Sequence, residues 1–143
     1  MRPNLWLAAG GTLSAAAALL HLAVIAGGPD WYRFFGAGEE MARAAERGSP
    51  VPVVITLGIA GLLSVWAAYA WAGAGLSPRL PLMRAALLAI TAVYLLRGLM
   101  LPAALAAGMK PDAFGWWSSL IVLGYGAIHA VGTWRAWPEL GRP

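Results

Sequence analysis

The chain alternates between four long apolar stretches and short polar segments that are rich in glycine, proline and charged residues. A helix needs about 20 consecutive apolar residues to cross the ~30 Å hydrocarbon core of a bilayer. A helix also satisfies its own backbone hydrogen bonds, which a lone strand in lipid cannot do. The pattern therefore predicts an all-α protein, an integral membrane four-helix bundle formed by a single domain, with spans at about 5–27, 51–75, 81–108 and 114–137.

Turn residues set the limits of these spans. Gly27, Gly28 and Pro29 end the first span, and Pro52 fits the first turn of the second because that position needs no backbone N–H. Trp137 and Pro138 are expected to close the last span. The N-terminus resembles a signal peptide, but its apolar run is too long for the hydrophobic region of such a signal. We therefore interpret that run as the first span.

The longest connection, residues 28–50, predicts a short helix outside the membrane. Glu39 and Glu40 stand in the first turn of the segment 38–47 and Arg47 in its last, which is the charge order that a helix dipole favours. The aromatic run 31–35 before it is typical of the lipid headgroup layer. The sequence thus predicts an amphipathic segment that lies on the outer surface of the membrane.

Composition supports the membrane class. Of the 143 residues 60% are hydrophobic and only 11% are charged, whereas soluble domains carry about 25% charged residues. The absence of cysteine excludes disulfides and thiolate metal sites. Basic residues do not cluster and no nucleic-acid motif is present, so we expect no nucleic-acid partner.

The distribution of basic residues predicts the orientation. With four spans both termini lie on one side, and the cytoplasmic side is expected to carry more cations. The side of the termini holds slightly more of them: Arg2, Arg79, Arg84, Arg135 and Arg142, against Arg33, Arg43, Arg47 and Lys110. We therefore expect cytoplasmic termini. The preference for arginine over lysine, with much alanine and glycine, suggests a bacterial protein of the inner (plasma) membrane.

Three ionisable residues fall inside the spans, namely His21, Arg97 and His129. Such residues are functional candidates because a guanidinium at the bilayer centre costs at least ~2.5–3.5 kcal/mol. Arg97 lies deep in the third span, and Tyr94 shares its face. Pro102 removes the backbone hydrogen bond to the carbonyl of residue 98. Arg97 therefore needs partners from other helices, the long loop or a ligand.

An outward-facing polar pocket follows from these positions. His21 lies at a depth similar to that of Arg97, and the long loop brings two carboxylates to the same side of the membrane. The predicted pocket or ligand-binding residues are His21, Arg97, Tyr94, Glu39 and Glu40. We expect Arg97 to point into the bundle and to pair with Glu39 or Glu40. The alternative is structural: Arg97 and His21 contact backbone carbonyls and fix helix packing.

His129 and Tyr125 are secondary candidates, on one face of the fourth span. Two membrane histidines raise the alternative of a b-type haem electron carrier with His21 and His129 as axial ligands. Their depths differ by about 10 Å along the helix axes, and opposed axial ligands need similar depth. No set of zinc ligands at one depth is evident. We therefore expect no metal and no cofactor.

Two strings, 31–39 (WYRFFGAGE) and 94–98 (YLLRG), resemble sequences of uncharacterised small membrane proteins of Gram-negative bacteria. The likeness extends over most of the chain and implies no known function. The four-span plan also resembles DoxX-type proteins, in architecture only, and architecture does not imply function.

The sequence favours a non-enzymatic membrane protein, either a binding protein for a lipid or small amphiphile or an accessory subunit of a larger membrane complex. Surrounding lipids, such a complex and a homo-oligomer are the expected partners. The alternative is an enzyme or transporter for a lipophilic substrate. It would use Glu39 or Glu40 with His21 for acid–base work and Arg97 to hold an anion. Whether the chain is an enzyme stays open at this point.

Overall fold

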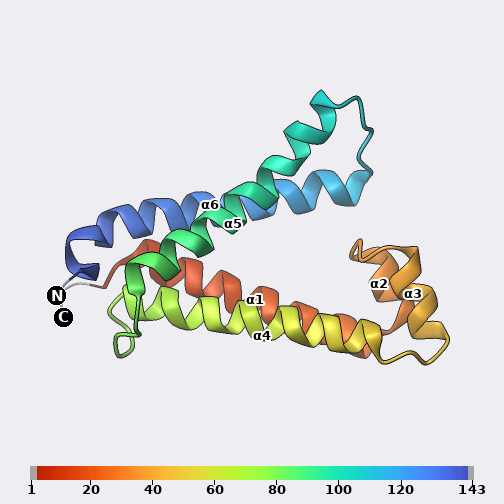
Figure 1. Ribbon diagram of the computed structural model, residues 1–143, viewed down its shortest axis with the longest axis horizontal. Helices are drawn as coiled ribbons and strands as arrows, with labels where there is room; N and C mark the ends of the chain where they lie inside the picture. The colour runs from red at the N-terminus through yellow and green to blue at the C-terminus, as the bar shows by residue number, and fades with distance from the viewer. Residues whose placement is uncertain (1–2, 142–143) are drawn as a thin grey trace. The chain divides into compact units, whose positions relative to one another are not determined.

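The computed structural model describes residues 3–141, so Arg2 and Arg142, which enter the orientation argument, lie outside the described residues. Every regular element in that range is a helix (Figure 1). In chain order the helices are α1 (Leu5–Gly27), α2 (Pro29–Phe34), α3 (Glu39–Glu46), α4 (Val51–Gly73), α5 (Met83–Ala106) and α6 (Ala113–Leu140). The all-α prediction is therefore confirmed, with two short helices between α1 and α4.

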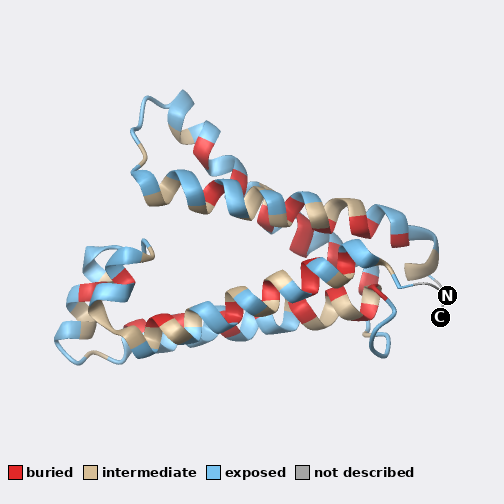
Figure 2. Ribbon diagram, turned by 180° about the vertical axis from the view of Figure 1, so that it is seen from behind, coloured by how far each residue is buried: buried red, intermediate tan, exposed pale blue. Residues whose placement is uncertain are grey.

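The four long helices α1, α4, α5 and α6 are long and apolar enough to cross a membrane. Between 17% and 33% of the residues in their most apolar windows are buried inside the protein. Residues that are not buried therefore make up most of each helix (Figure 2), and many of them are large apolar residues. Water would not tolerate so much apolar surface, and lipid does. By length and composition the chain is a small multi-pass membrane protein.

Several ends of the long helices differ from the predicted limits of the spans, among them the end of α4, the start of α5 and the end of α6. Helix α4 ends at Gly73, two residues early, and α5 begins at Met83 because Leu82 has a left-handed φ of 56°. The expected stop at Trp137 and Pro138 is wrong, since α6 continues to Leu140. Pro138 removes only one backbone hydrogen bond there, and the helix ends two residues later.

The connection between α1 and α4 contains one helix more than the sequence predicted. Helix α3 confirms the predicted segment 38–47 within one residue at each end. The aromatic run before it forms α2, which has Pro29 in its first turn, where the fixed φ of proline suits a helix start. Helices α2 and α3 pack against each other.

Contacts divide the chain into two compact units. Unit 1 consists of residues 1–13 and 65–143, and unit 2 of residues 14–64. Helices α1 and α4 run through both units. Unit 1 therefore holds the start of α1, the end of α4 and the whole of α5 and α6, and unit 2 holds the rest with α2 and α3.

Unit 1 is held by close contacts at glycines. A Cβ atom on Gly132 of α6 would lie 2.8 Å from Cγ of Leu7 and 2.9 Å from its backbone nitrogen. One on Gly98 of α5 would lie 2.7 Å from Cα of Leu123 on α6. Small residues at such crossings let helix backbones approach closely, which is how helices associate where lipid removes the hydrophobic driving force.

Asn4 reinforces the first of these contacts. Its side-chain oxygen accepts hydrogen bonds from the backbone N–H groups of Trp6, at 3.1 Å, and Leu7, at 3.2 Å, and so caps α1. Its side-chain nitrogen donates to the carbonyl of Gly132 at 2.8 Å. Its backbone N–H donates to the carbonyl of Ala74, after the end of α4, at 3.0 Å. One residue thus joins α1, α4 and α6.

Unit 2 has a small core of its own. Tyr32 of α2 is buried against Val24 of α1 and Ala42 of α3. Its hydroxyl lies 3.4 Å from the hydroxyl of Thr56 on α4, which also donates to the carbonyl of Pro52 at 2.7 Å. Tyr32 therefore links α2 and α3 to the parts of α1 and α4 that belong to this unit.

We predict that Gly132→Ala destabilises the protein, because the added methyl meets the backbone of Leu7 and neither helix can yield without breaking the Asn4 hydrogen bonds. Overpacking of this kind costs about 1–3 kcal/mol. Gly124→Ala on the same helix is the matched control, because a Cβ there meets nothing within 4 Å. Thermal unfolding in one detergent compares the two. Equal melting temperatures would contradict the close contact.

Candidate functional site

Arg97 bridges the two helices of the α5–α6 pair. Its Nη1 donates to the hydroxyl of Ser119 at 3.3 Å. Ser119 is buried, whereas Arg97 itself is exposed. The sequence did not identify Ser119 as a partner, because a single serine carries no signal of which helix face meets α5. A neutral hydroxyl is a weak partner for a guanidinium, so most of its hydrogen-bonding capacity is not used by Ser119.

Tyr94 lies at the centre of a buried aromatic cluster in unit 1. Its ring centroid is 5.0 Å from that of Trp66 on α4, 5.6 Å from that of Tyr125 and 5.0 Å from that of His129, both on α6. The structure therefore joins one predicted pocket residue to the two secondary candidates. Aromatic pairs of this kind add about 0.5–1.5 kcal/mol each, which gives the cluster a role in packing.

His129 is fully buried in this cluster. Its Nδ1 bonds to the carbonyl of Tyr125, one turn earlier, at 2.9 Å. A Cβ on Gly10 of α1 would lie 2.8 Å from the imidazole Cε1, so the ring lies against the bare backbone of α1. Nε2 is enclosed and has no protein partner among residues 3–141, and the same holds for Oγ1 of Thr133. An axial haem ligand needs an accessible ring nitrogen, so this geometry disfavours a haem at His129.

His21 is half-buried in unit 2 and bonded within its own helix. Its Nδ1 contacts the carbonyl of Ala17, one turn earlier, at 2.7 Å. This is the backbone-carbonyl contact that the structural alternative requires. The other ring nitrogen, Nε2, is the atom by which His21 would act on a ligand.

Glu39 belongs to an ionic network that joins α2 to α3. Arg33 of α2 donates to carboxylate oxygens of Glu39 at 2.9 and 3.2 Å, of Glu46 at 2.6 Å and of Asp30 at 3.3 Å. Arg43 donates to Glu39 at 3.0 Å. Hydrogen bonds from Arg33, and then from Arg43, lower the pKa of Glu39 to about 2. The hydrogen bonds that Arg33 makes with Glu39 and Glu46 raise the pKa of Arg33 above its ordinary value.

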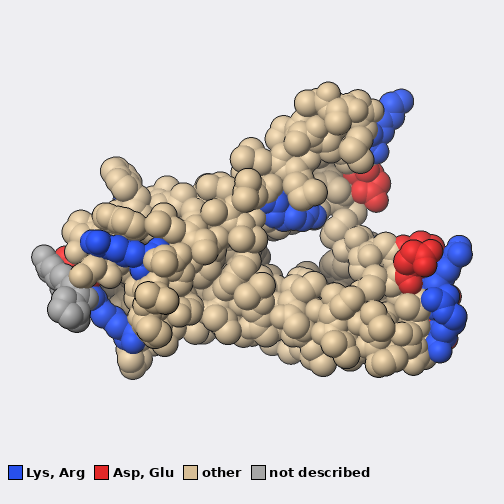
Figure 3. All heavy atoms as spheres, in the orientation of Figure 1, with Lys and Arg blue, Asp and Glu red and all other residues tan. Residues whose placement is uncertain are grey.

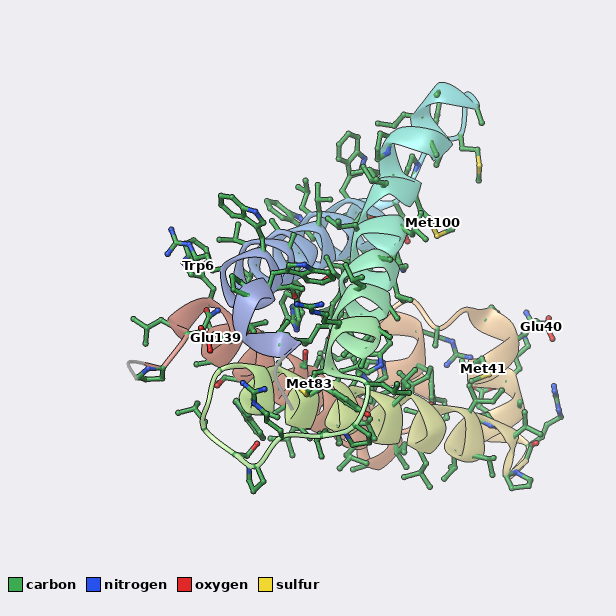
Figure 4. The ribbon with its side chains drawn as sticks, turned by 60° about the vertical axis from the view of Figure 1, so that its left-hand side comes forward. Trp6, Glu40, Met41, Met83, Met100 and Glu139 are labelled. Atoms are coloured by element: carbon green, nitrogen blue, oxygen red, sulfur yellow. The ribbon has the colours of Figure 1, made fainter. Side chains whose placement is uncertain are left out.

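Glu40, the other predicted carboxylate, is exposed and points away from α3 (Figure 4). The predicted pocket residues thus belong to both units: His21, Glu39 and Glu40 to unit 2, and Tyr94 and Arg97 to unit 1. The pair between Arg97 and a carboxylate of the loop stays a prediction.

A pocket of about 730 Å³ opens in unit 1 where α1 begins and α6 ends, which we call the terminal pocket. Its lining includes Asn4, Arg79, Arg135 and Glu139, with the α4–α5 loop forming one wall. A second pocket of about 390 Å³ shares Arg79 with it and adds Arg84. Trp6 and Glu139 lie at this end of the molecule (Figure 4).

Tryptophans hold two arginines beside the terminal pocket. The guanidinium carbon of Arg84 is 4.8 Å from the ring centroid of Trp137, and its Nη2 donates to the Trp137 carbonyl at 3.1 Å. Arg135 lies over Trp6 at 5.6 Å. Cation–π contacts of exposed groups contribute about 0.5–1 kcal/mol. The sequence predicted Arg84 and Arg135 on the membrane side that holds the termini. It gave no sign of their pairing with tryptophans, because that depends on how α1, α5 and α6 are rotated.

Charged side chains gather over α2–α3 and near the chain ends (Figure 3). Among residues 3–141 no group of three or more His, Asp or Glu side chains is placed to hold a metal ion. Comparisons with models of known protein families, with curated proteins and with solved structures found no match. The protein class therefore rests on the spans and the site geometry alone.

We predict that the α2–α3 network weakens in acid. A carboxyl group whose pKa is lowered on folding contributes stability above its unfolded-state pKa, here 4.5, and loses that contribution as the pH falls toward about 2. Spin labels at Ala37→Cys and Arg47→Cys should report a constant distance from pH 8 to pH 5 and a broader distribution below pH 4.5. Arg33→Gln should broaden it at every pH. An unchanged distribution at about pH 1, below the folded-state pKa of Glu39, would contradict the network.

We also predict energetic coupling between Arg97 and Ser119. A double-mutant cycle with Arg97→Met and Ser119→Ala should give a coupling free energy of about 0.6 kcal/mol, the average for hydrogen bonds between membrane helices. Parallel cycles that combine Arg97→Met with Glu39→Gln or with Glu40→Gln test the pair predicted from the sequence. Coupling in either cycle supports the outward pocket, and strict additivity in both refutes the pair. Additivity in the Ser119 cycle would show that the bond contributes nothing to stability.

Proposed function

We propose that this small multi-pass membrane protein is a non-enzymatic binding protein for an anionic lipid, whose phosphate headgroup occupies the terminal pocket. The observation that carries the proposal is the lining of this pocket by Arg79 and Arg135, with Arg84 in the adjoining recess. Glu139 is the acidic side chain in that lining, so cationic groups prevail there. Basic pockets at the ends of transmembrane helices bind the headgroups of anionic phospholipids.

The chemistry of arginine supports this assignment. A guanidinium presents several N–H donors in one plane, which fits the oxygens of a phosphate. Trp6 and Trp137 hold two of the arginines at the level of the membrane interface, where tryptophan is enriched. A phosphate at that level brings the acyl chains of the same lipid alongside the apolar helices.

An apolar groove continues from this end along α5 and α6. It has a volume of about 350 Å³ and is lined by Leu88, Thr91, Ala130, Thr133, Trp134 and Trp137. Trp137 also carries Arg84, so the groove begins where the basic recess ends. An acyl chain fits such a surface, and together the two features describe an amphiphile site.

The outward-facing pocket around Arg97 stays a prediction, as does an accessory role in a larger complex. The geometry of the terminal pocket favours this end of the helices for the headgroup. Cytoplasmic termini, if the orientation follows the cation distribution, would assign the site to the inner leaflet.

The test is lipid retention by the purified full chain. Mixed micelles with phosphatidylglycerol or phosphatidylcholine are followed by native mass spectrometry. We expect preferential binding of phosphatidylglycerol. In Arg79→Gln/Arg135→Gln this should weaken by about tenfold or more, because each arginine near a membrane surface contributes about 1 kcal/mol toward anionic lipid.

A second double variant is the matched control. Arg47→Gln/Lys110→Gln removes the same charge from exposed positions that do not line the pocket. It should bind phosphatidylglycerol like the unmodified protein. Equal losses in the two variants would reduce the effect to net charge and refute a specific site, as would equal binding of both lipids.

A further inference from the structure

Helix α2 divides its side chains among three directions. Tyr32 is buried toward α1 and α3, and Arg33 is engaged by the three carboxylates of the ionic network. Phe34 and the C-cap residue Phe35 lie three and four residues after Trp31, so both share its face of the helix. Phe34 is 73% exposed and Trp31 is 42% exposed. The polar and the buried directions are therefore occupied, and the exposed part of the aromatic face consists of Phe34 and Trp31, while Phe35 is half-buried against the small core of unit 2.

The aromatic face is an ordered surface. The rings of Phe34 and Phe35 meet edge to face with centroids 4.9 Å apart, and those of Trp31 and Phe35 are 5.6 Å apart. The same three aromatic residues, with Asp30, line a shallow recess of about 480 Å³. An exposed cluster of large aromatic side chains marks an interaction surface.

The chain places this face at the boundary of the membrane. Helix α1 ends at Gly27 and α2 begins at Pro29. A Cβ on Gly27 would overlap the indole of Trp31, so the indole lies directly on the last turn of α1. Helix α4 begins at Val51, within five residues of the end of α3. Both ends of the segment are thus tied to the ends of helices long and apolar enough to cross a membrane, so the lipid headgroup layer is within reach of its aromatic face.

We infer that the aromatic face of α2, formed by Trp31, Phe34 and Phe35, inserts into the headgroup and upper acyl layer of the membrane and anchors the α2–α3 segment there. The partner is the phospholipid surface itself. Amphipathic aromatic rings favour that layer, and short helices with one apolar face lie in it. The ionic network on the other side of α2 stays in water and carries α3 with it. This inference is independent of lipid binding at the terminal pocket.

Depth measurement by electron paramagnetic resonance tests the anchor. The chain contains no cysteine, so single labels can be placed without other changes. Phe34→Cys reports the aromatic face, and Glu40→Cys, on the exposed side of α3, is the matched control. Both labelled full-length proteins are reconstituted in phosphatidylcholine vesicles. The relaxing effects of oxygen, which concentrates in lipid, and of a water-soluble nickel chelate are then compared.

We expect the ratio of accessibility to oxygen over accessibility to the nickel chelate to be severalfold higher for the label at residue 34 than for the label at residue 40. Equal accessibility to the nickel chelate at both positions would overturn the inference and leave α2 in water. A label at residue 34 that is immobile and shielded from both reagents would also overturn it, because a protein would then cover the face. Far-ultraviolet circular dichroism of both variants checks that the helices are intact, and Trp31→Cys supplies a second position on the same face.

Discussion

The packing of unit 1 depends on the crossing of α1 and α6, where the backbone of Leu7 lies against Gly132. Lipid gives helices no hydrophobic reason to associate, so close contact and hydrogen bonding must hold them together. Gly132 supplies the space, and Asn4 supplies a bond to its carbonyl together with the cap of α1. One turn further along α1, Gly10 gives the space in which the imidazole of His129 is buried. Two glycines on different helices therefore determine where the aromatic cluster of α4, α5 and α6 can form.

The same crossing shapes the basic end of unit 1. Because Asn4 binds both α6 and the chain after α4, it brings the last turns of α6 beside the α4–α5 loop. Arg135 and Arg79 come from these two segments and line one pocket. The tryptophans beside them are placed by the ends of α1 and α6. The proposed site for an anionic headgroup thus depends on helix packing that the hydrogen bonds of Asn4 hold in place.

The spans could be predicted from the sequence because length and hydropathy act on each helix separately. The contacts of the site could not, because they depend on rotation about the helix axes. Tyr94 and Arg97 share a face by sequence spacing, yet Tyr94 is buried and Arg97 is exposed, since the boundary of the α5–α6 contact runs between them. Ser119, on α6, contacts Arg97, and Trp66, on α4, contacts Tyr94. Both contacts depend on how these helices are rotated toward α5. Helix α2 was missed because six residues are too few to show a helical period, and the aromatic composition masked Pro29 as a helix start.

Uncharged polar side chains in the spans are mostly satisfied by the helix that carries them. The side chains of Thr56, Ser64 and Thr91 donate to carbonyls one turn earlier, and His21 and His129 make the equivalent contact. Such bonds need no second helix, so a polar residue that makes one has its hydrogen bond without taking part in a functional site. A guanidinium has too many donors for one carbonyl, and Arg97 reaches across to α6 for a partner. Arg84 and Arg135, near the helix ends, differ from Arg97 because each lies over the face of a tryptophan ring. Recognition of an anion is therefore better supported at the ends of these helices than at their centres.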